Sequence, residues 1–136
     1  MQAQTEIIVR GYHVDMYGHV NNARYLEFLE EGRWAVFEKK VDLARWAARG
    51  LGFMVVNINV NYRRTAVPGT RLLVATDLEK IGSRSAVLKQ EIRVKETGDI
   101  VVDALVTFVV SDKTGTLIPM DDEITAELLK LEQQAA

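Results

Sequence analysis

The stretch from Tyr12 to Phe37 constrains the fold more than any other part of the chain. Its first half, through Asn22, gathers a carboxylate, two histidines, a glycine and two adjacent asparagines, which are polar, turn-forming side chains. Its second half carries an apolar stripe at the 3.6-residue period of a helix, with charged side chains opposite. The stripe is Tyr25, Phe28, Leu29, Gly32 and Val36, and the opposite face is Arg24, Glu27, Glu31 and Glu38. We therefore expect a functional loop that leads directly into a long helix, with Asn22 or Asn21 as the N-cap.

The start of this helix can act chemically together with the loop. The first turn of a helix leaves backbone N–H groups without partners, and the peptide dipoles place about half a positive charge there. Such N–H groups can hold a carbonyl oxygen while a nearby carboxylate, here Asp15, acts on the carbonyl carbon. This pairing favours acyl transfer or hydrolysis. The alternative is that Asp15 only forms a turn, which is the commoner role of an aspartate before a helix.

Composition narrows the class of protein. The chain has 136 residues, which predicts one domain spanning residues 1–136. The 17 Lys and Arg residues nearly balance the 19 Asp and Glu residues without any basic block, so nucleic acid is not an expected partner. There is no cysteine, which excludes disulfides, thiolate metal clusters and a cysteine nucleophile. With no apolar leader and no run long enough for a membrane span, we expect a cytoplasmic protein without stable membrane insertion.

The remaining pattern predicts an α+β fold in which one helix lies across a curved antiparallel sheet. Gly32 would let that helix sit close to the sheet. We expect a terminal helix at Asp121–Glu132 and fraying from Gln133 to Ala136. The other expected elements are strands at Glu6–Tyr12, Phe53–Val67, Arg71–Ile81, Ser85–Lys95 and Ile100–Ser111, and a short helix at Val41–Arg49.

Two features of the central region each allow two interpretations. Trp46, in the short helix, is either a core residue or a lid over an apolar cavity. In the strand Phe53–Val67, Asn57, Asn59 and Asn61 share one face, while Val56, Ile58, Val60 and Tyr62 share the other. The asparagines either form a hydrated surface or hydrogen-bond across a subunit contact. Because a sheet with one covering helix leaves unprotected edges, we predict a dimer in which two copies of this strand meet edge to edge.

Three sequence strings resemble a known family. They are VDMYGHVNNARYL at residues 14–26, NINVNYRR at 57–64 and DALVTFV at 103–109. Together they resemble the hotdog-fold acyl-CoA thioesterases of the 4-hydroxybenzoyl-CoA thioesterase family. Within it the chain looks most like the subgroup of bacterial long-chain acyl-CoA thioesterases III. The likeness implies a five-stranded antiparallel sheet wrapped around a long central helix, with an active site shared between two subunits.

The resemblance also implies roles for individual residues. Asp15 matches the catalytic carboxylate, and the backbone N–H of Asn22 matches the group that polarises the thioester carbonyl. Gly18 matches the glycine that lets the loop turn tightly before the substrate. His19 is either a substrate-side hydrogen-bond donor or a loop-packing residue, and His13 is structural. We expect no cofactor, and we reject a metal site formed by His13, Asp15 and His19.

The expected substrate is a long-chain acyl-CoA, hydrolysed with Asp15 as general base or as nucleophile. Arg63, Arg64 and Arg84 are candidates for the CoA phosphates, although an arginine beside a turn is usually solvated. The acyl chain would enter an apolar slot between helix and sheet, lined by Tyr25, Phe28, Leu29, Phe53 and Val56. The alternative functions are a hotdog-fold enoyl-CoA hydratase and a non-catalytic acyl-binding module. The dimers are expected to pair into a homotetramer.

Overall fold

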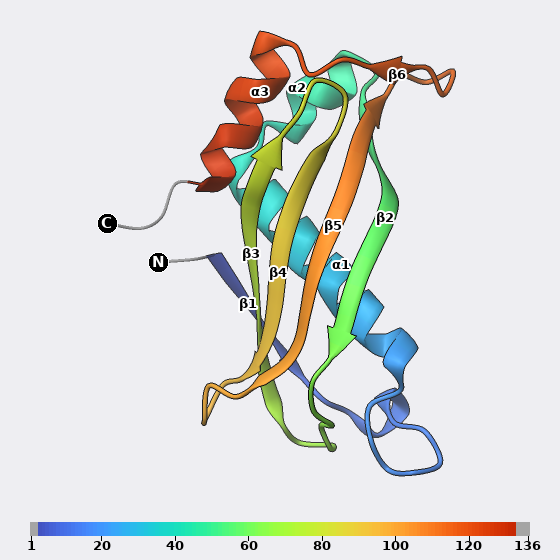
Figure 1. Cartoon of the computed structure of the whole chain (residues 1–136), viewed down its shortest axis with the longest axis vertical. Coiled ribbons are helices and arrows are strands. Elements are labelled where there is room, and N and C mark those ends of the chain that lie inside the picture. Colours follow the sequence, from blue (N-terminus) through green and yellow to red (C-terminus); the bar gives the residue numbers. More distant parts are fainter. Residues whose placement is uncertain (1–2, 133–136) are drawn as a thin grey trace.

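The fold is an antiparallel sheet that curves around one long helix, α1 (Figure 1). It was obtained as a computed structural model that describes residues 3–132. The strands run in the order β1-β3-β4-β5-β2, and the short β6 pairs with β5. The elements are β1 (Ala3–Ile8), α1 (Asn22–Lys40), α2 (Leu43–Ala48), β2 (Gly52–Tyr62), β3 (Arg71–Ile81), β4 (Ala86–Val94), β5 (Ile100–Ser111), β6 (Leu117–Ile118) and α3 (Asp122–Leu129).

The prediction of an α+β fold with an antiparallel sheet is confirmed, and the prediction of five strands needs correction. Five long strands form the ordered path, but the sheet has six strands because the two-residue β6 adds to β5. β3 and β5 have the predicted bounds. β1 instead begins earlier and ends at Ile8. The chain leaves the sheet there because Gly11–His13 forms a 3-10 turn, closed by the Arg10 N–H donating to Nδ1 of His13 at 2.8 Å.

Helix α1 presents the predicted apolar stripe to the sheet, and every residue of that stripe is buried. Its N-cap is Asn21 rather than Asn22, since the Asn21 Oδ1 accepts a hydrogen bond from the Ala23 N–H at 2.9 Å. Gly32 sits against β3, where a Cβ would lie 2.5 Å from Cγ1 of Val74. The expected close contact between helix and sheet is therefore confirmed.

A β-bulge in β2 breaks the predicted alternation. The pairing with β5 shifts between Val55 and Asn57, which leaves Val56 as an extra residue with 55% of its surface exposed. Phe53 and Val55 before the bulge, and Ile58 after it, border the same cavity under α1. Val56 is therefore not on the inner face that simple alternation predicted. The strand also ends at Tyr62 instead of Val67.

The upper end of the molecule is closed by α2, α3 and β6, and the lower end by the loop between β1 and α1 (Figure 1). Ion pairs join α2 to α3, with Arg45 and Arg49 both contacting Glu123 at 2.8 and 3.1 Å. The terminal helix matches its prediction, since α3 is N-capped by Asp121 and continues as a 3-10 turn at Lys130–Glu132. The predicted fraying of Gln133–Ala136 lies outside the described residues. None of the helices in residues 3–132 combines the length and apolar character that a membrane span requires.

Candidate active site

The polar loop is a small hairpin with Asp15 near its tip. Val14 and Val20 form a bridge, and the Asp15 N–H donates to the His19 carbonyl at 3.0 Å. Gly18 has a φ of 78°, which favours glycine, and its N–H donates to the Asp15 carbonyl at 3.0 Å. This tight turn leaves Asp15 exposed at the surface.

The Asp15 side chain has the turn-forming role, and its catalytic role stays a prediction. Its Oδ1 accepts a hydrogen bond from the Tyr17 N–H at 2.9 Å, which is the bond of a turn-forming aspartate. The carboxylate nevertheless faces solvent, and among residues 3–132 no cation lies within ion-pair distance of it. The turn therefore holds the carboxylate in place and leaves one oxygen available to a substrate.

The start of α1 offers an unpaired backbone donor. The Asn21 side chain caps the Ala23 N–H, and the Arg24 N–H donates to the Asn21 carbonyl at 2.8 Å. In the described part of the chain the Asn22 N–H has no acceptor. The hairpin is fixed to this helix start, because the Asn21 N–H donates to the His13 carbonyl at 2.9 Å. Asp15 and the Asn22 N–H thus lie at the same end of the molecule.

The two histidines have different surroundings. His13 is buried, and its ring lies 4.9 Å from that of Phe28. Burial lowers the pKa of His13, and the neighbouring Arg24 lowers it further. Because Nδ1 accepts from Arg10, the neutral ring carries its proton on Nε2. His19 is half-buried, and its backbone carbonyl holds Asp15.

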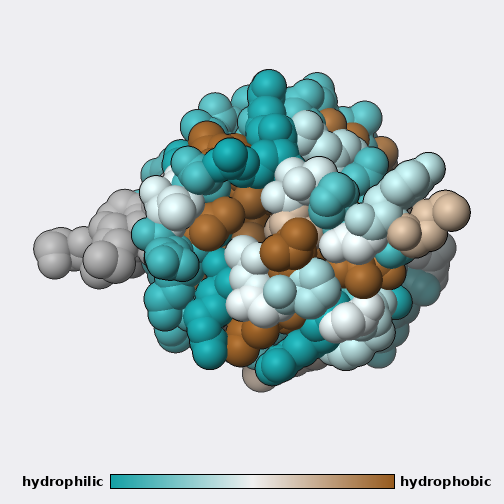
Figure 2. Space-filling view, turned by 90° about the horizontal axis from the view of Figure 1, so that it is seen from below, coloured by the Kyte–Doolittle hydropathy of each residue, from teal (hydrophilic) through white to brown (hydrophobic). Residues whose placement is uncertain are grey.

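Large apolar and aromatic side chains are exposed beside the carboxylate. Tyr12, Met16 and Tyr17 all project from the hairpin, and Met16 is 90% exposed. In the view from below, hydrophobic patches interrupt the polar surface at this end of the molecule (Figure 2). Such exposure next to a candidate catalytic group is typical of a surface that contacts a ligand or a second chain.

Three of the five residues predicted to line the acyl slot lie in the packed core and do not border a cavity. Tyr25, Phe28 and Leu29 are buried in the packed core. The Tyr25 hydroxyl has no hydrogen-bond partner among the described residues, and burial raises the pKa of Tyr25 to about 12. The Ala66 N–H opposes that rise but lies outside hydrogen-bonding geometry. Tyr25 is therefore a core residue in this chain and does not face an open slot.

A cavity of about 640 Å³ lies instead between α1, α2 and β2. Phe53 lines it as predicted. Trp46 is a core residue, since it is 3% exposed, and it also forms part of the cavity wall, where it stacks on Phe53 with ring centroids 4.3 Å apart. Four further wall residues belong to α1 and were not predicted, although their spacing places them on one side of the helix and is the signal that could have revealed them. They are Glu30, Arg33, Trp34 and Phe37.

The three candidate phosphate ligands do not form one cluster within the chain. Arg63 donates from Nε to Oδ2 of Asp103 at 2.6 Å, and Arg64 pairs with Asp99. Arg84 lies in the turn between β3 and β4, where the neighbouring Ser83 carbonyl accepts from the Met120 N–H. That turn is at the upper end of the sheet, away from Asp15 (Figure 1).

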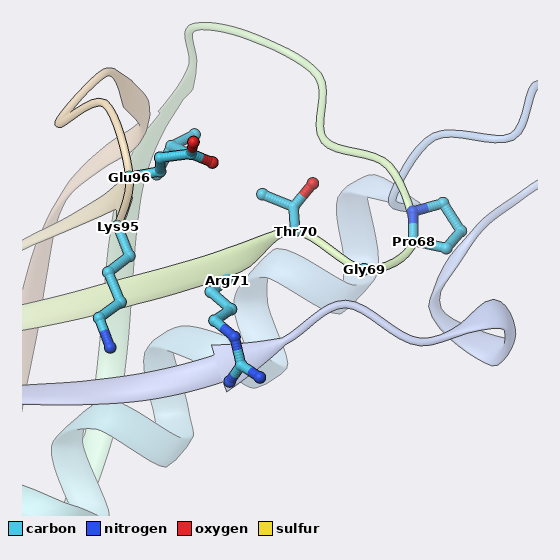
Figure 3. Close-up of a pocket in the computed structure, with 7 residues that line it drawn as sticks. Pro68, Gly69, Thr70, Arg71, Lys95 and Glu96 are labelled. Atoms are coloured by element: carbon cyan, nitrogen blue, oxygen red, sulfur yellow. The ribbon is translucent and has the colours of Figure 1, made fainter.

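A second hollow, of about 750 Å³, lies at the lower end beside the first residues of β3 (Figure 3). Its two cations, Arg71 and Lys95, extend along the same side (Figure 3). Both contact the carboxylate of Glu6, at 2.8 and 2.7 Å. Their charge is thus partly neutralised, so this hollow is a weaker candidate for a ligand site than the cavity under α1.

Comparison with known proteins assigns the chain to a family. Residues 9–128 match the sequence profile of the thioesterase-like superfamily. The chain is 46% identical over 126 residues to the long-chain acyl-CoA thioesterase FadM of Escherichia coli, a match that covers 92% of this chain and 96% of the relative. A crystal structure of the probable thioesterase YbaW from Escherichia coli superposes with a TM-score of 0.89 at 44% identity, covering 96% and 98% of the two chains.

A more distant structure shares the fold. A 1,4-dihydroxy-2-naphthoyl-CoA thioesterase from Synechocystis has a TM-score of 0.82 at 17% identity, covering 96% of this chain and 98% of its own. The predicted resemblance to hotdog thioesterases is confirmed by these matches. The chain belongs to the thioesterase-like superfamily.

Proposed function

We propose that this protein hydrolyses the thioester of long-chain fatty acyl-CoA to a free fatty acid and CoA. The observation that carries the proposal is the pairing of an exposed, turn-held carboxylate at Asp15 with the unpaired Asn22 N–H at the start of α1. The name and high identity of the Escherichia coli long-chain acyl-CoA thioesterase support the substrate class. The whole of residues 1–136 would act as one catalytic domain.

The proposed chemistry uses the helix terminus as an oxyanion donor. Within residues 3–132 the Asn22 N–H donates to no protein acceptor, and the dipole of α1 favours negative charge on the carbonyl oxygen as it develops. Asp15 acts in one of two ways. As a general base it takes a proton from water, whose oxygen attacks the carbonyl carbon and expels the CoA thiolate, which is then protonated. As a nucleophile it expels the thiolate itself, and water then cleaves the resulting mixed anhydride.

A dimer would complete the site. β2 is paired only on its β5 side within residues 3–132, and Met54, Val55 and Val56 are exposed on it. Two such strands pairing antiparallel about a two-fold axis would place the Tyr62 end of one beside the Gly52 end of the other. The Asp15 hairpin belongs to the Tyr62 end, because the Tyr62 hydroxyl donates to the Asn22 carbonyl at 3.4 Å. The carboxylate of one protomer would then face the apolar cavity of its partner.

The other contacts of the substrate follow from this assembly. The acyl chain occupies the cavity under α1. Gly18 allows the tight turn of the hairpin, which leaves room for the thioester to reach the Asn22 N–H. His19 lies beside Asp15 and donates to the substrate side of the site. Arg63 and Arg64 bind the CoA phosphates with the N–H groups that Asp103 and Asp99 leave free, and Arg84 is a further candidate for these phosphates. Pairing of dimers into a tetramer, and a cytoplasmic location, stay predictions.

The test is Asp15→Asn, measured as release of CoA thiol from a long-chain acyl-CoA. The amide keeps an oxygen for the Tyr17 N–H and so preserves the turn, while it removes the charge and the basicity. We expect turnover to fall by about a hundredfold or more, the usual contribution of a general base. Because a hydratase would release no thiol, the same assay separates the two enzymatic alternatives.

The matched control is Asp112→Asn. Asp112 also accepts hydrogen bonds from turn N–H groups, those of Thr114 and Thr116. It directly follows β5, at the end of the molecule opposite to Asp15. Its substitution should leave turnover unchanged. An Asp15→Asn enzyme that retains turnover to within about threefold of the wild type would end the proposal. Trapping an acyl group on Asp15, detected by mass spectrometry, would select the nucleophilic mechanism.

A further inference from the structure

The cavity under α1 contains a charged group that its apolar walls do not explain. Arg33 lines it together with Trp34, Phe37 and Phe53. Among residues 3–132, three arginines have no carboxylate within ion-pair distance, and of these Arg33 is half-buried whereas Arg10 and Arg84 are exposed. Burial lowers the pKa of Arg33, although the charge of Glu30 opposes this.

A buried amide network holds this guanidinium in place. Arg33 donates from one terminal nitrogen to Oε1 of Gln90 at 3.1 Å. Gln90 is fully buried, and its Nε2 donates to the Leu29 carbonyl at 3.0 Å and to Oγ1 of Thr76 at 2.8 Å. Because both N–H groups of the amide are used, its oxygen must face Arg33. The network therefore points the arginine inward, between α1 and the sheet.

The nearest carboxylate at the cavity does not neutralise it. Glu30 is exposed, and its Oε2 accepts a hydrogen bond from Nε1 of Trp34 at 3.2 Å. Of the five N–H donors of the Arg33 guanidinium, one has a protein acceptor in the described part of the chain. Desolvating a cation without an acceptor is costly, and the cost is recovered when a ligand oxygen binds the free donors.

The size of the cavity suits a ligand that could supply this oxygen. Its volume of about 640 Å³ is within the usual range for small-molecule sites, which are mostly apolar with a few placed polar groups. Aromatic walls would hold a hydrocarbon chain, and a planar guanidinium with several free donors favours a carboxylate, or more weakly a hydroxyl.

We propose that Arg33 is a specificity-determining residue that recognises an oxygen function, a carboxylate or a hydroxyl, on the acyl chain held in this cavity. The inference rests on the proposed thioesterase function and adds a preference within the long-chain class: oxygenated chains are accepted as well as, or better than, plain hydrocarbon chains. A cavity with only apolar walls would instead reject them, because their polar end would lose its hydration without replacement.

The experiment compares three acyl-CoA substrates of equal chain length, ending in methyl, hydroxyl and carboxylate groups. The value of kcat/KM for each oxygenated chain is divided by that for the plain chain. We expect Arg33→Met to lower this ratio by roughly tenfold or more for the carboxylate, because the carboxylate would lose its charged partner inside the cavity. Arg33→Lys should restore part of it. Arg71→Met, which removes an exposed arginine paired with Glu6, should leave the ratio unchanged.

The outcomes separate this inference from the function on which it rests. If the wild type cleaves none of the three thioesters, the proposed function fails. If it cleaves the plain chain and Arg33→Met leaves the ratio unchanged, Arg33 is satisfied by water or by a partner subunit and the inference is wrong. If Arg33→Met does not fold, the wild type alone decides: rejection of both oxygenated chains by tenfold or more relative to the plain chain overturns the inference, and equal or better cleavage supports it.

Discussion

At the scale of single residues, the polar atoms of this chain that lack partners carry most of the information about function. Within residues 3–132 the Asn22 N–H has no acceptor, Arg33 has no carboxylate within ion-pair distance, and the Tyr25 hydroxyl has no hydrogen-bond partner. The first two face regions that a substrate could reach. Tyr25 does not, because it is 2% exposed and lies on the buried face of α1. We therefore expect its hydroxyl to matter for stability and not for turnover.

Tyr25→Phe tests this expectation. The substitution removes a buried hydroxyl without a partner, which leaves the apolar contacts intact and relieves a desolvation cost. The free energy of unfolding in urea at pH 7 should stay the same or rise, and turnover should be retained. A fall of more than about 1 kcal/mol would show that the hydroxyl does make a hydrogen bond in solution.

The same variant should change the alkaline pH dependence. The pKa of Tyr25 is raised to about 12 in the folded protein, so an unfolded chain ionises first. Stability from this residue is complete below pH 10 and is lost as the pH rises toward 12, by at most about 1.4 kcal/mol per pH unit. Urea unfolding of wild type and Tyr25→Phe between pH 8 and 11 should show a steeper fall for the wild type. Parallel curves would contradict the assignment.

At the scale of secondary-structure elements, the site depends on how closely α1 lies against the sheet. Gly32 permits this approach, which seats Gln90 beneath the helix and lets it reach both Leu29 and Arg33. The bulge at Val56 has a complementary effect on β2, because it keeps Phe53 and Ile58 on the same cavity wall. One glycine and one inserted residue thus shape the space between helix and sheet.

Gly32→Ala should destabilise the protein even though alanine favours helix. The added methyl would lie 2.5 Å from Cγ1 of Val74, and overpacking of this kind costs about 1–3 kcal/mol. The gain in helix propensity is at most about 1 kcal/mol. Urea unfolding should therefore show a net loss. Adding Val74→Ala should relieve the clash and recover part of the helix gain.

Gly11→Ala is the control for this experiment. Among the described residues, apart from Gly11 and its two chain neighbours, no heavy atom lies within 4 Å of the position where its Cβ would be, and its φ is not positive. Its substitution should change stability by less than about 0.5 kcal/mol. If Gly32→Ala behaves like Gly11→Ala, the helix has room that the structure does not show.

At the scale of the whole molecule, the two parts of the proposed site lie at opposite ends of one chain. Asp15 is at the lower end, while the cavity is bounded by α2 and the beginning of β2 at the upper end (Figure 1). A monomer would therefore hold the carboxylate far from the acyl pocket. An antiparallel pairing of two chains through β2 would bring the two together, so turnover and dimerisation should be lost together.

Val56→Lys tests this coupling. A lysine on an exposed strand edge blocks pairing with another strand. Because Val56 is exposed in the single chain, the variant chain should still fold. We expect the wild type to run at twice the mass of one chain or more in size-exclusion chromatography with light scattering. The variant should run at the mass of one chain and have little turnover. Leu117→Lys, exposed on β6, should change neither property. A wild type that is monomeric and fully active would rule out the shared site.

Sequence patterns over a few residues predicted the structural features that depend only on neighbouring residues. The stripe on α1, the bounds of β3 and β5, and the N-cap of α1 at Asn21, one of its two candidates, follow from periodicity and capping chemistry. The patterns misplaced Val56, because a bulge is set by pairing with β5 and not by the strand itself. They also assigned Tyr25 to a substrate slot, because core and cavity residues share the same helical spacing.

The sequence by itself determined the fold class, the family, and the loop and helix start where the chemistry is proposed to occur, since turn-forming and capping residues act over a few positions of the chain. Only the tertiary structure decided that the cavity lies under the far half of α1, that Trp46 stacks on Phe53 in its wall, and that Gln90 turns Arg33 toward it. Those contacts join residues far apart in sequence. Their positions follow from sheet register and helix packing, which no single segment of the chain encodes.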